Sequence, residues 1–216
     1  MEEKKSVIKE ILEWGYCIII AVVLALLVRY FLGTPTLVQQ QSMETTFMPG
    51  DRLILSRWTK TRKGEYKRGD IITFEAPSKS VLSLAEVDFE NPVASYKNEP
   101  TSLWGKFKKY VLEINKISYI KRIIGVSGDH IEIKDGKVFL NNQELKENYL
   151  SEGLRTDLGS YGVYSEVIVP EGYVFVMGDN RGHSTDSRCF GCIPVSKIEG
   201  KVWIKFWPFT KFGKVE

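Results

Sequence analysis

The chain has 216 residues, which is enough for one domain or two small ones. Its net charge is only +3, and its basic residues are scattered among acidic ones. This pattern argues against a nucleic-acid partner, because proteins that bind nucleic acids gather lysine and arginine on one face.

Residues 15–32 form an apolar segment that contains a single charge, Arg29. As a helix they would span roughly 27 Å, close to the thickness of about 30 Å of a bilayer's hydrocarbon core. Trp14 and Tyr30 stand near the two ends, where aromatic side chains favour the membrane interface. We therefore predict a transmembrane anchor over residues 14–32.

Two other interpretations of this segment are weaker. A buried helix of a soluble protein would show a polar face, and this segment is apolar all round. A cleaved signal peptide would be followed by a site of the Ala-x-Ala kind, and none follows here.

The charges on the two sides of the anchor predict its orientation. Lys4, Lys5 and Lys9 precede it, whereas residues 33–51 contain no lysine or arginine. By the positive-inside rule, residues 1–13 form a cytoplasmic tail and residues 33–216 form an exported domain.

Short apolar runs separated by turn residues predict a mainly β exported domain, an antiparallel, barrel-like sheet. An Asp135-Gly136 pair predicts a tight hairpin turn. The predicted strands are residues 52–56, 71–74, 118–124, 130–133, 137–140, 166–169, 173–177 and 201–206.

Residues 78–115 interrupt this pattern as a variable insertion. Apolar residues recur at helical spacing over 103–114, with lysines between them. The helix could lie on anionic lipid, but packing over the sheet with a solvated basic face is favoured. Trp203 and Trp207 share one face of the last strand, so they meet either lipid headgroups or a neighbouring loop.

Of the three cysteines, Cys17 lies in the anchor, and Cys189 and Cys192 lie on the exported side. An exported compartment permits a disulfide between the last two, and two reduced thiols in a turn are the alternative. A zinc site is not expected, because no second cysteine or histidine pair completes four ligands.

The pair that suggests chemistry is Ser42 and Lys121. Ser42 follows the anchor by ten residues, so even a fully extended chain keeps it within roughly 36 Å of the membrane. A serine hydroxyl needs a base to become a nucleophile. Lys121 lies in an apolar strand without a nearby acidic residue, and burial favours the neutral amine that can act as that base.

A polar loop over residues 177–188 follows another apolar strand. It contains Asp179, Ser184, Asp186 and Arg188 among other polar residues. Such a loop could be a solvated turn, or it could supply a hydroxyl that orients the amine and an Asp–Arg pair that braces the site.

Together these segments resemble a known family. Residues 41–43, 69–72, 119–125 with 128–129, and 178–188 are similar, in that order, to the conserved boxes of bacterial type I signal peptidases. The resemblance covers nearly the whole chain. It implies a membrane-bound serine endopeptidase with a Ser/Lys dyad, which removes signal peptides from exported preproteins after small residues at −1 and −3.

The resemblance also implies roles for matching residues and implies no metal or cofactor. Signal peptides of preproteins and the lipid bilayer are the expected partners, and contact with the export machinery is compatible with this placement. The implied roles are Ser42 as nucleophile, Lys121 as general base, Ser184 as the group that orients the lysine, the Ser42 N–H as an oxyanion donor, Arg122, Asp179, Asp186 and Arg188 as structural support, and Val38, Met43, Tyr119 and Ile120 as the substrate-binding surface.

Two residues near Ser42 depart from the family pattern. Thr45 replaces the usual proline, which predicts a looser turn after the nucleophile. Gln40 stands where the family tends to have Ser or Gly, and its side-chain amide would have to serve as the second oxyanion donor. These changes motivate an alternative, a weakly active or inactive assembly factor for surface structures. A self-cleaving regulator related to repressor autoproteases fits less well, because the chain has an anchor and no DNA-binding segment.

Overall fold

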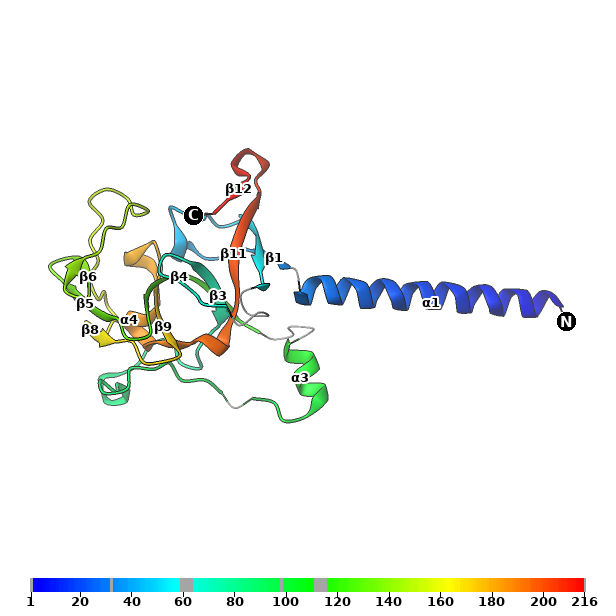
Figure 1. Cartoon of the computed structure of the whole chain (residues 1–216), viewed down its shortest axis with the longest axis horizontal. Coiled ribbons are helices and arrows are strands. Elements are labelled where there is room, and N and C mark those ends of the chain that lie inside the picture. The colour runs from blue at the N-terminus through cyan, green and yellow to red at the C-terminus, as the bar shows by residue number, and fades with distance from the viewer. Residues whose placement is uncertain (1, 32, 59–63, 98, 111–115, 216) are drawn as a thin grey trace.

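The structure is a computed structural model that describes residues 2–31, 33–58, 64–97, 99–110 and 116–215. One long helix projects from a β-rich domain, and it enters that domain beside the first strand (Figure 1). Two predicted boundaries, the end of the anchor at residue 32 and the end of the inserted helix at residue 114, lie outside the described residues.

The projecting helix α1 spans Glu2–Phe31. It contains a window, Lys9–Leu27, with a mean hydropathy of 2.1 and no residue buried by the rest of the chain. These 19 residues are long and apolar enough to cross a bilayer. The helix also takes in most of the predicted tail, whose Glu, Lys, Ile and Leu residues favour helix.

The strands pair antiparallel, as predicted, and form two sheets rather than a single one. The larger has the order β1-β2-β11-β3-β4-β9-β10, with β12 paired to β11, and the smaller has the order β7-β6-β5-β8. The strands are β1 (Gly33–Leu37), β2 (Arg52–Ser56), β3 (Ile71–Glu75), β4 (Ser118–Val126), β5 (His130–Lys134), β6 (Lys137–Leu140), β7 (Gln143–Glu144), β8 (Glu166–Ile168), β9 (Tyr173–Met177), β10 (Ile193–Pro194), β11 (Ile198–Trp207) and β12 (Gly213–Lys214).

All eight predicted strands are present, with ends that differ by at most a few residues. The hairpin turn is confirmed too, because Asp135 and Gly136 have φ angles of 54° and 79°, as a type I′ turn requires. The four strands that the sequence did not predict include β1, whose Gly-Thr-Pro-Thr-Leu sequence lacks a β-like alternation.

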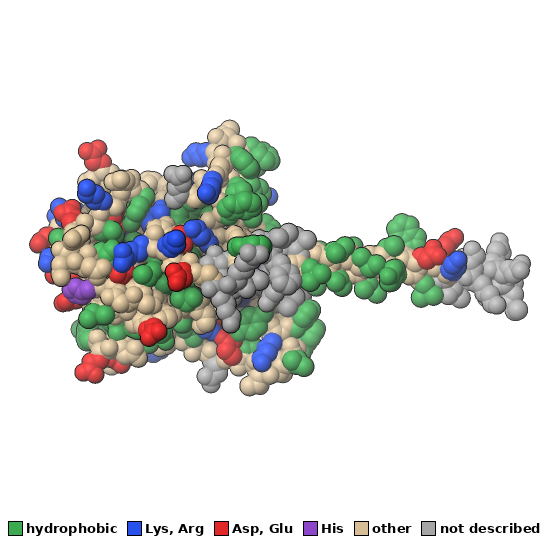
Figure 2. Space-filling view, in the orientation of Figure 1, with side chains coloured by type: hydrophobic (Ala, Val, Ile, Leu, Met, Phe, Trp, Pro, Cys, Tyr) green, Lys and Arg blue, Asp and Glu red, His purple; other side chains and the backbone are tan. Residues whose placement is uncertain are grey.

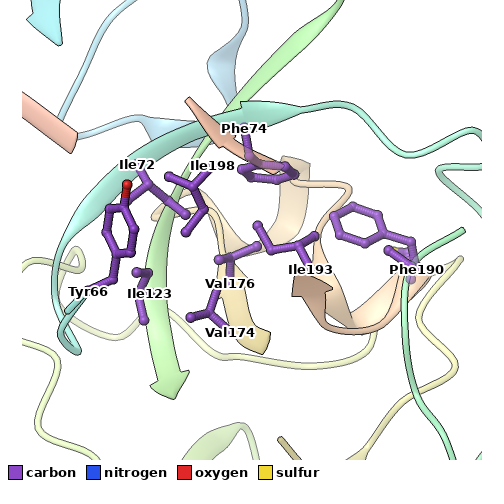
Figure 3. Packing of buried hydrophobic residues seen from close by; sticks show 11 residues of the cluster. Tyr66, Ile72, Phe74, Ile123, Val174, Val176, Phe190, Ile193 and Ile198 are labelled. Atoms are coloured by element: carbon purple, nitrogen blue, oxygen red, sulfur yellow. The ribbon is translucent and has the colours of Figure 1, made fainter. Parts of the chain in front are cut away.

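Three hydrophobic clusters fill the domain. The first, shown in Figure 3, joins side chains of β3, β4, β9 and β11 with those of the short helix α4 (Ser187–Phe190). The second lies beneath the smaller sheet. The third joins Val38, Met43 and Phe47 to β2, β3 and β11. The residues around Ser42 are thus anchored directly in a core.

The inserted helix is confirmed as α3, Leu103–Tyr110, but its predicted packing is wrong. None of its residues is buried, and Leu103 and Trp104 are 86% and 61% exposed. Figure 2 shows apolar side chains over this helix and over the end of β11, both on the side of the domain from which α1 projects. Trp203, Trp207, Phe209 and Phe212 are exposed there as well.

The disulfide interpretation is also corrected. Cys189 and Cys192 are both free and buried. They point into different cores, because Cys189 belongs to the first cluster and Cys192 to the second. Burial raises the pKa of both thiols, that of Cys192 to about 12, so both stay protonated near neutral pH.

Candidate active site

Ser42 lies in a single turn of 3₁₀ helix, Gln41–Met43, between β1 and β2. Its side chain is almost fully buried. The turn is fixed from below by Met43, which packs in the third cluster, and from the side by Asn180, whose backbone N–H donates to the Ser42 carbonyl over 3.1 Å. Contacts of Met43 and Asn180 therefore hold the backbone around Ser42 in place.

Lys121 lies in the middle of β4, where its side chain is 2% exposed. Its Nζ is 2.7 Å from Ser42 Oγ and donates to the Ile120 carbonyl over 3.0 Å. The two residues are 79 positions apart in the sequence, and the fold brings them into direct hydrogen-bond contact.

Burial lowers the pKa of Lys121 from its ordinary 10.5 to about 8. Removal from water disfavours the charged ammonium and is the largest cause. Asp186 and Asp179 oppose this shift, and Arg188 adds to it. The amine is therefore neutral in a useful fraction of molecules near neutral pH.

Arg122, the next residue of β4, forms a buried two-pronged ion pair. Its Nε and Nη2 donate to the two carboxylate oxygens of Asp179 over 2.9 and 2.8 Å, and its Nη1 donates to the Gly69 carbonyl. Its guanidinium also lies over the ring of Tyr149. This arrangement ties β4 to the loop that follows β9.

The same Asp179 accepts a hydrogen bond from the Thr46 hydroxyl. A second bond runs from the Asn180 side-chain amide to the Gln41 carbonyl over 3.1 Å. Bonds from the 178–188 loop thus reach residues on both sides of Thr45, the position where the family has proline.

Asp186 and Arg188 form the second buried pair of this loop. Asp186 is fully buried, caps α4, and accepts from Arg188 Nε and Nη2 over 2.8 Å each and from the Gly178 N–H over 3.0 Å. Although burial raises the pKa of this carboxyl, the bonds from Arg188 and Gly178 outweigh it and leave the pKa below its ordinary value. Arg188 also donates to the carbonyls of Asp157 and Arg181.

Ser184 lies beside the dyad, but its hydroxyl is not bonded to the lysine. Its Oγ is buried and faces the Asp186 carboxylate, whose pKa it helps to lower. A Cβ added to Gly178 would come within 2.3 Å of both Ser184 Oγ and the Ser42 carbonyl. Glycine at 178 is thus what lets the loop approach the nucleophile so closely.

An open cleft lies beside β1 and the start of β4 and consists of three hollows that share lining residues. The nucleophile hollow, about 620 Å³, is lined by Gln39, Gln40, Gln41, Ser42, Pro49, Tyr119, His183 and Thr185. The middle hollow, about 220 Å³, is lined by residues 36–40, Thr73 and residues 116–120. The anchor-side hollow, about 370 Å³, is lined by Thr34, Pro35, Thr36, Leu55, Arg57, Thr73, Ser118 and Glu199.

A sequence profile of a single family, described as signal peptidase, peptidase S26, matches residues 11–207. The chain belongs to this family. It is a serine peptidase of the signal peptidase I type, and the resemblance inferred from its sequence boxes is confirmed.

Named relatives match over nearly their full length. The chain is 36% identical to signal peptidase I of Bacillus licheniformis, with 100% of both chains covered. It is 35% identical to signal peptidase I T of Bacillus subtilis strain 168, covering 95% of this chain and 90% of that one. A crystal structure of a signal peptidase I from Enterococcus faecalis V583 is 26% identical, covers 63% of this chain and 96% of that one, and has a TM-score of 0.39.

Three of the four residues predicted for the substrate surface of this peptidase do lie on the cleft. Val38, Tyr119 and Ile120 line the middle hollow. Met43 does not: it is fully buried in the third cluster, so it supports the nucleophile's turn from below. Gln40 is exposed and lines both the nucleophile and the middle hollow.

Sequence reasoning missed two residues of the site. Asn180 bonds to the carbonyls of Gln41 and Ser42, as described above. Arg181 is buried and pairs with Glu147, and it also donates to Thr156 and to the Gly178 carbonyl. In the sequence, Arg181 is one long basic residue in a polar loop, which is a weak signal for a role in the site. Its partners Glu147 and Thr156 lie in a distant segment of the chain.

Proposed function

We propose that this chain is a membrane-anchored endopeptidase that removes signal peptides through a Ser42/Lys121 dyad. The observation that carries the proposal is the contact of 2.7 Å between Lys121 Nζ and Ser42 Oγ in a buried site. Membership of the signal peptidase family supplies the substrate class.

In the first step, the neutral amine of Lys121 takes the proton of the Ser42 hydroxyl while Oγ bonds to the carbonyl carbon of the scissile peptide. With a pKa of about 8, about a tenth of the lysines are neutral at pH 7. An unperturbed lysine would be neutral far more rarely, so burial makes the base available.

In the second step, the carbon–nitrogen bond breaks and the ammonium of Lys121 returns the proton to the leaving amine. The signal peptide remains as an ester on Ser42, and the mature protein leaves with a new N-terminus. A water molecule then gives a proton to Lys121 and attacks the ester carbonyl carbon. The bond from that carbon to Ser42 Oγ breaks, Lys121 returns the proton to Oγ, and the signal peptide leaves with a free carboxyl group.

Negative charge develops on the substrate's carbonyl oxygen during both attacks. We assign the Ser42 backbone N–H and the Gln40 side-chain amide as its hydrogen-bond donors. Support comes from the position of Gln40, which lines the same hollow as Ser42 and is exposed enough to turn toward a substrate. Ser184, whose buried hydroxyl lies near both Asp186 and the turn of Ser42, is assigned to orient the lysine once that amine is neutral.

We infer that α1 holds this site at the outer surface of the membrane. The Lys9–Leu27 window would span about 28 Å of bilayer. Lysines on its N-terminal side favour a cytoplasmic N-terminus. The exposed apolar side chains of α3 and of the β11–β12 end, on the side from which α1 projects, are suited to contact lipid.

Cleavage of a preprotein by the full-length chain in lipid vesicles tests the proposal. With a preprotein that has Ala at −1 and −3, we expect one cut after the −1 residue, and we expect Ser42→Ala to abolish it. Ser151→Ala changes an exposed loop serine and should cleave like the wild type.

Two outcomes would contradict this function. Equal cleavage by wild type and Ser42→Ala would remove Ser42 from the mechanism. No cleavage by the wild type, in vesicles where the chain is folded, would favour the assembly-factor alternative that the Gln40 and Thr45 departures motivate.

A further inference from the structure

The helix α3 carries an apolar face that the rest of the described chain leaves exposed. Leu103 and Phe107 lie one turn apart with Trp104 beside them, and all three side chains are exposed. The rings of Trp104 and Phe107 stack, with their centroids 5.6 Å apart. These three side chains form the α3 patch. Large apolar side chains that gather on a surface mark a contact with another protein or with a membrane.

Ion pairs attach the opposite face of α3 to the domain. A helix of 3.6 residues per turn places Lys109 across from the α3 patch. Lys109 pairs with Glu75 of β3 at 2.8 Å and with Glu99 at 3.1 Å. The Tyr110 hydroxyl also donates to Glu99, and Lys197 pairs with both carboxylates. This network holds α3 with its apolar patch turned away from the domain.

Lysines border the α3 patch on both sides. The same helical geometry places Lys106 along one edge of the patch and Lys108 along the other, and both are exposed. The Lys108 ammonium lies 5.4 Å from the centroid of the Trp104 ring. Neither lysine pairs with a carboxylate of the described residues. An apolar face edged by such lysines is typical of a helix that lies in the interface of an anionic membrane.

A hollow of about 570 Å³, the α3 hollow, lies between α3 and the sheet. Four lysines line it, Lys97, Lys108, Lys109 and Lys116, together with one carboxylate, that of Glu75. Lys109 and Lys116 are engaged in ion pairs. Lys97, like Lys108, has no carboxylate partner in the part of the chain that the structure describes. The α3 hollow therefore has an excess of positive charge, and the several acceptor oxygens of a phosphate group suit two lysine ammoniums.

The position of α3 favours a lipid as the source of that phosphate. The helix lies on the side of the domain from which α1 projects (Figures 1 and 2), and the Lys9–Leu27 window of α1 is long enough to cross a bilayer. The headgroup layer would therefore lie against this side. A free phosphate ion would use only the lysines, whereas a phospholipid offers phosphate to the lysines and acyl chains to the α3 patch.

The α3 hollow also adjoins the cleft. Lys116 and Ile117 line both the α3 hollow and the middle hollow of the cleft. They stand just before β4, the strand that carries Lys121. A headgroup held in the α3 hollow would therefore set the position of the cleft relative to the bilayer surface.

We propose that the α3 hollow binds the phosphate headgroup of an anionic phospholipid, with Lys97 and Lys108 as its ligands and the α3 patch inserted among the acyl chains beside it. The proposal rests on the proposed function in one respect, because it takes α1 as the segment that crosses the bilayer. It assigns to residues 97–110 of the insertion a lipid specificity, for anionic over zwitterionic headgroups, that the apolar patch alone would not give.

A spin label on α3 tests this assignment in the full-length chain. With Cys17→Ser and Leu103→Cys, a nitroxide is attached at position 103, because Cys189 and Cys192 are buried. The chain is placed in nanodiscs of phosphatidylcholine, with or without phosphatidylglycerol. Electron paramagnetic resonance compares collisions of the label with oxygen, which concentrates in the bilayer, and with a nickel chelate in water. We expect phosphatidylglycerol to favour the inserted state by roughly thirtyfold, because each of two lysines gains about fivefold at an anionic surface.

Matched double variants identify the lysines responsible. Lys97→Gln with Lys108→Gln should abolish the effect of phosphatidylglycerol. Lys137→Gln with Lys146→Gln removes the same charge from the smaller sheet, whose strands lie at the end of the domain away from α1 (Figure 1), and should keep it. The proposal is overturned if the label behaves alike in both lipids, or if the Lys97, Lys108 variant keeps the effect.

Two further measurements separate the remaining outcomes. If inorganic phosphate removes the effect where chloride of the same ionic strength does not, the site takes free phosphate and the lipid assignment is overturned. Cleavage of the preprotein with Ala at −1 and −3 is measured in the same nanodiscs. A chain that cleaves without the lipid effect contradicts only this proposal, whereas a chain that shows the effect without cleaving contradicts only the peptidase function.

Discussion

Replacing Lys121 by methionine is expected to lower kcat/KM for preprotein cleavage by about 10⁴-fold, as loss of one member of a nucleophile–base unit does in other serine peptidases. Methionine preserves most of the buried stem and needs no hydrogen bond, so the fold should survive. Without the amine, no group of suitable pKa lies in contact with Ser42 Oγ among the described residues. Initial rates of cleavage in vesicles at pH 8 would measure the loss.

Lys146→Met is the matched control, because Lys146 is an exposed lysine far along the chain from the site. Its activity should equal that of the wild type. The double variant Ser42→Ala, Lys121→Met should be no less active than either single one, since the two residues act as one unit. A Lys121→Met enzyme within tenfold of the wild type would contradict the assignment.

Replacing Arg188 by methionine is expected to destabilise the exported domain by about 3–5 kcal/mol, because it leaves the fully buried Asp186 without its partner. The loop that carries Gly178 and Ser184 should lose its position, so activity should fall as well. Denaturant unfolding of the detergent-solubilised chain, followed by near-UV circular dichroism, would measure the change in free energy of unfolding.

Two further variants distinguish the stability lost with a buried ion pair from the stability lost by replacing any arginine. Arg155→Met removes an exposed arginine that lies 3.8 Å from Asp157, and it should change the free energy by less than about 1 kcal/mol. Asp186→Leu combined with Arg188→Met should cost less than the sum of the two single changes. Additive costs, or an Arg188→Met variant as stable as Arg155→Met, would refute the pairing.

The sequence predicted those parts of the fold that depend on local patterns. The strand that holds Lys121 and Arg122 is apolar and is followed by a clear turn signal, and the apolar length of α1 is unmistakable. The proposed dyad could be located from the sequence because Ser42 and Lys121 stand in recognisable boxes. Their contact at 2.7 Å, however, depends on pairing between segments 79 residues apart, which no local pattern encodes.

The errors arose where side-chain surroundings decide the outcome. Helical spacing in α3 suggested a packed face, yet within the described part of the chain Leu103 and Trp104 stay 86% and 61% exposed. Cys189 and Cys192 are close in sequence but point into separate cores. Met43 was placed on the substrate surface, whereas its side chain fills the third cluster.

The pH dependence of kcat/KM between pH 6 and 10 tests the central claim most directly. Because Lys121 must be neutral to accept the proton, activity should rise with pH and reach half its plateau near the pKa of about 8. Below pH 7 the rate should fall nearly tenfold for each pH unit. A half-point near 10.5, or a rate that does not change over this range, would show that Lys121 is not the base that activates Ser42.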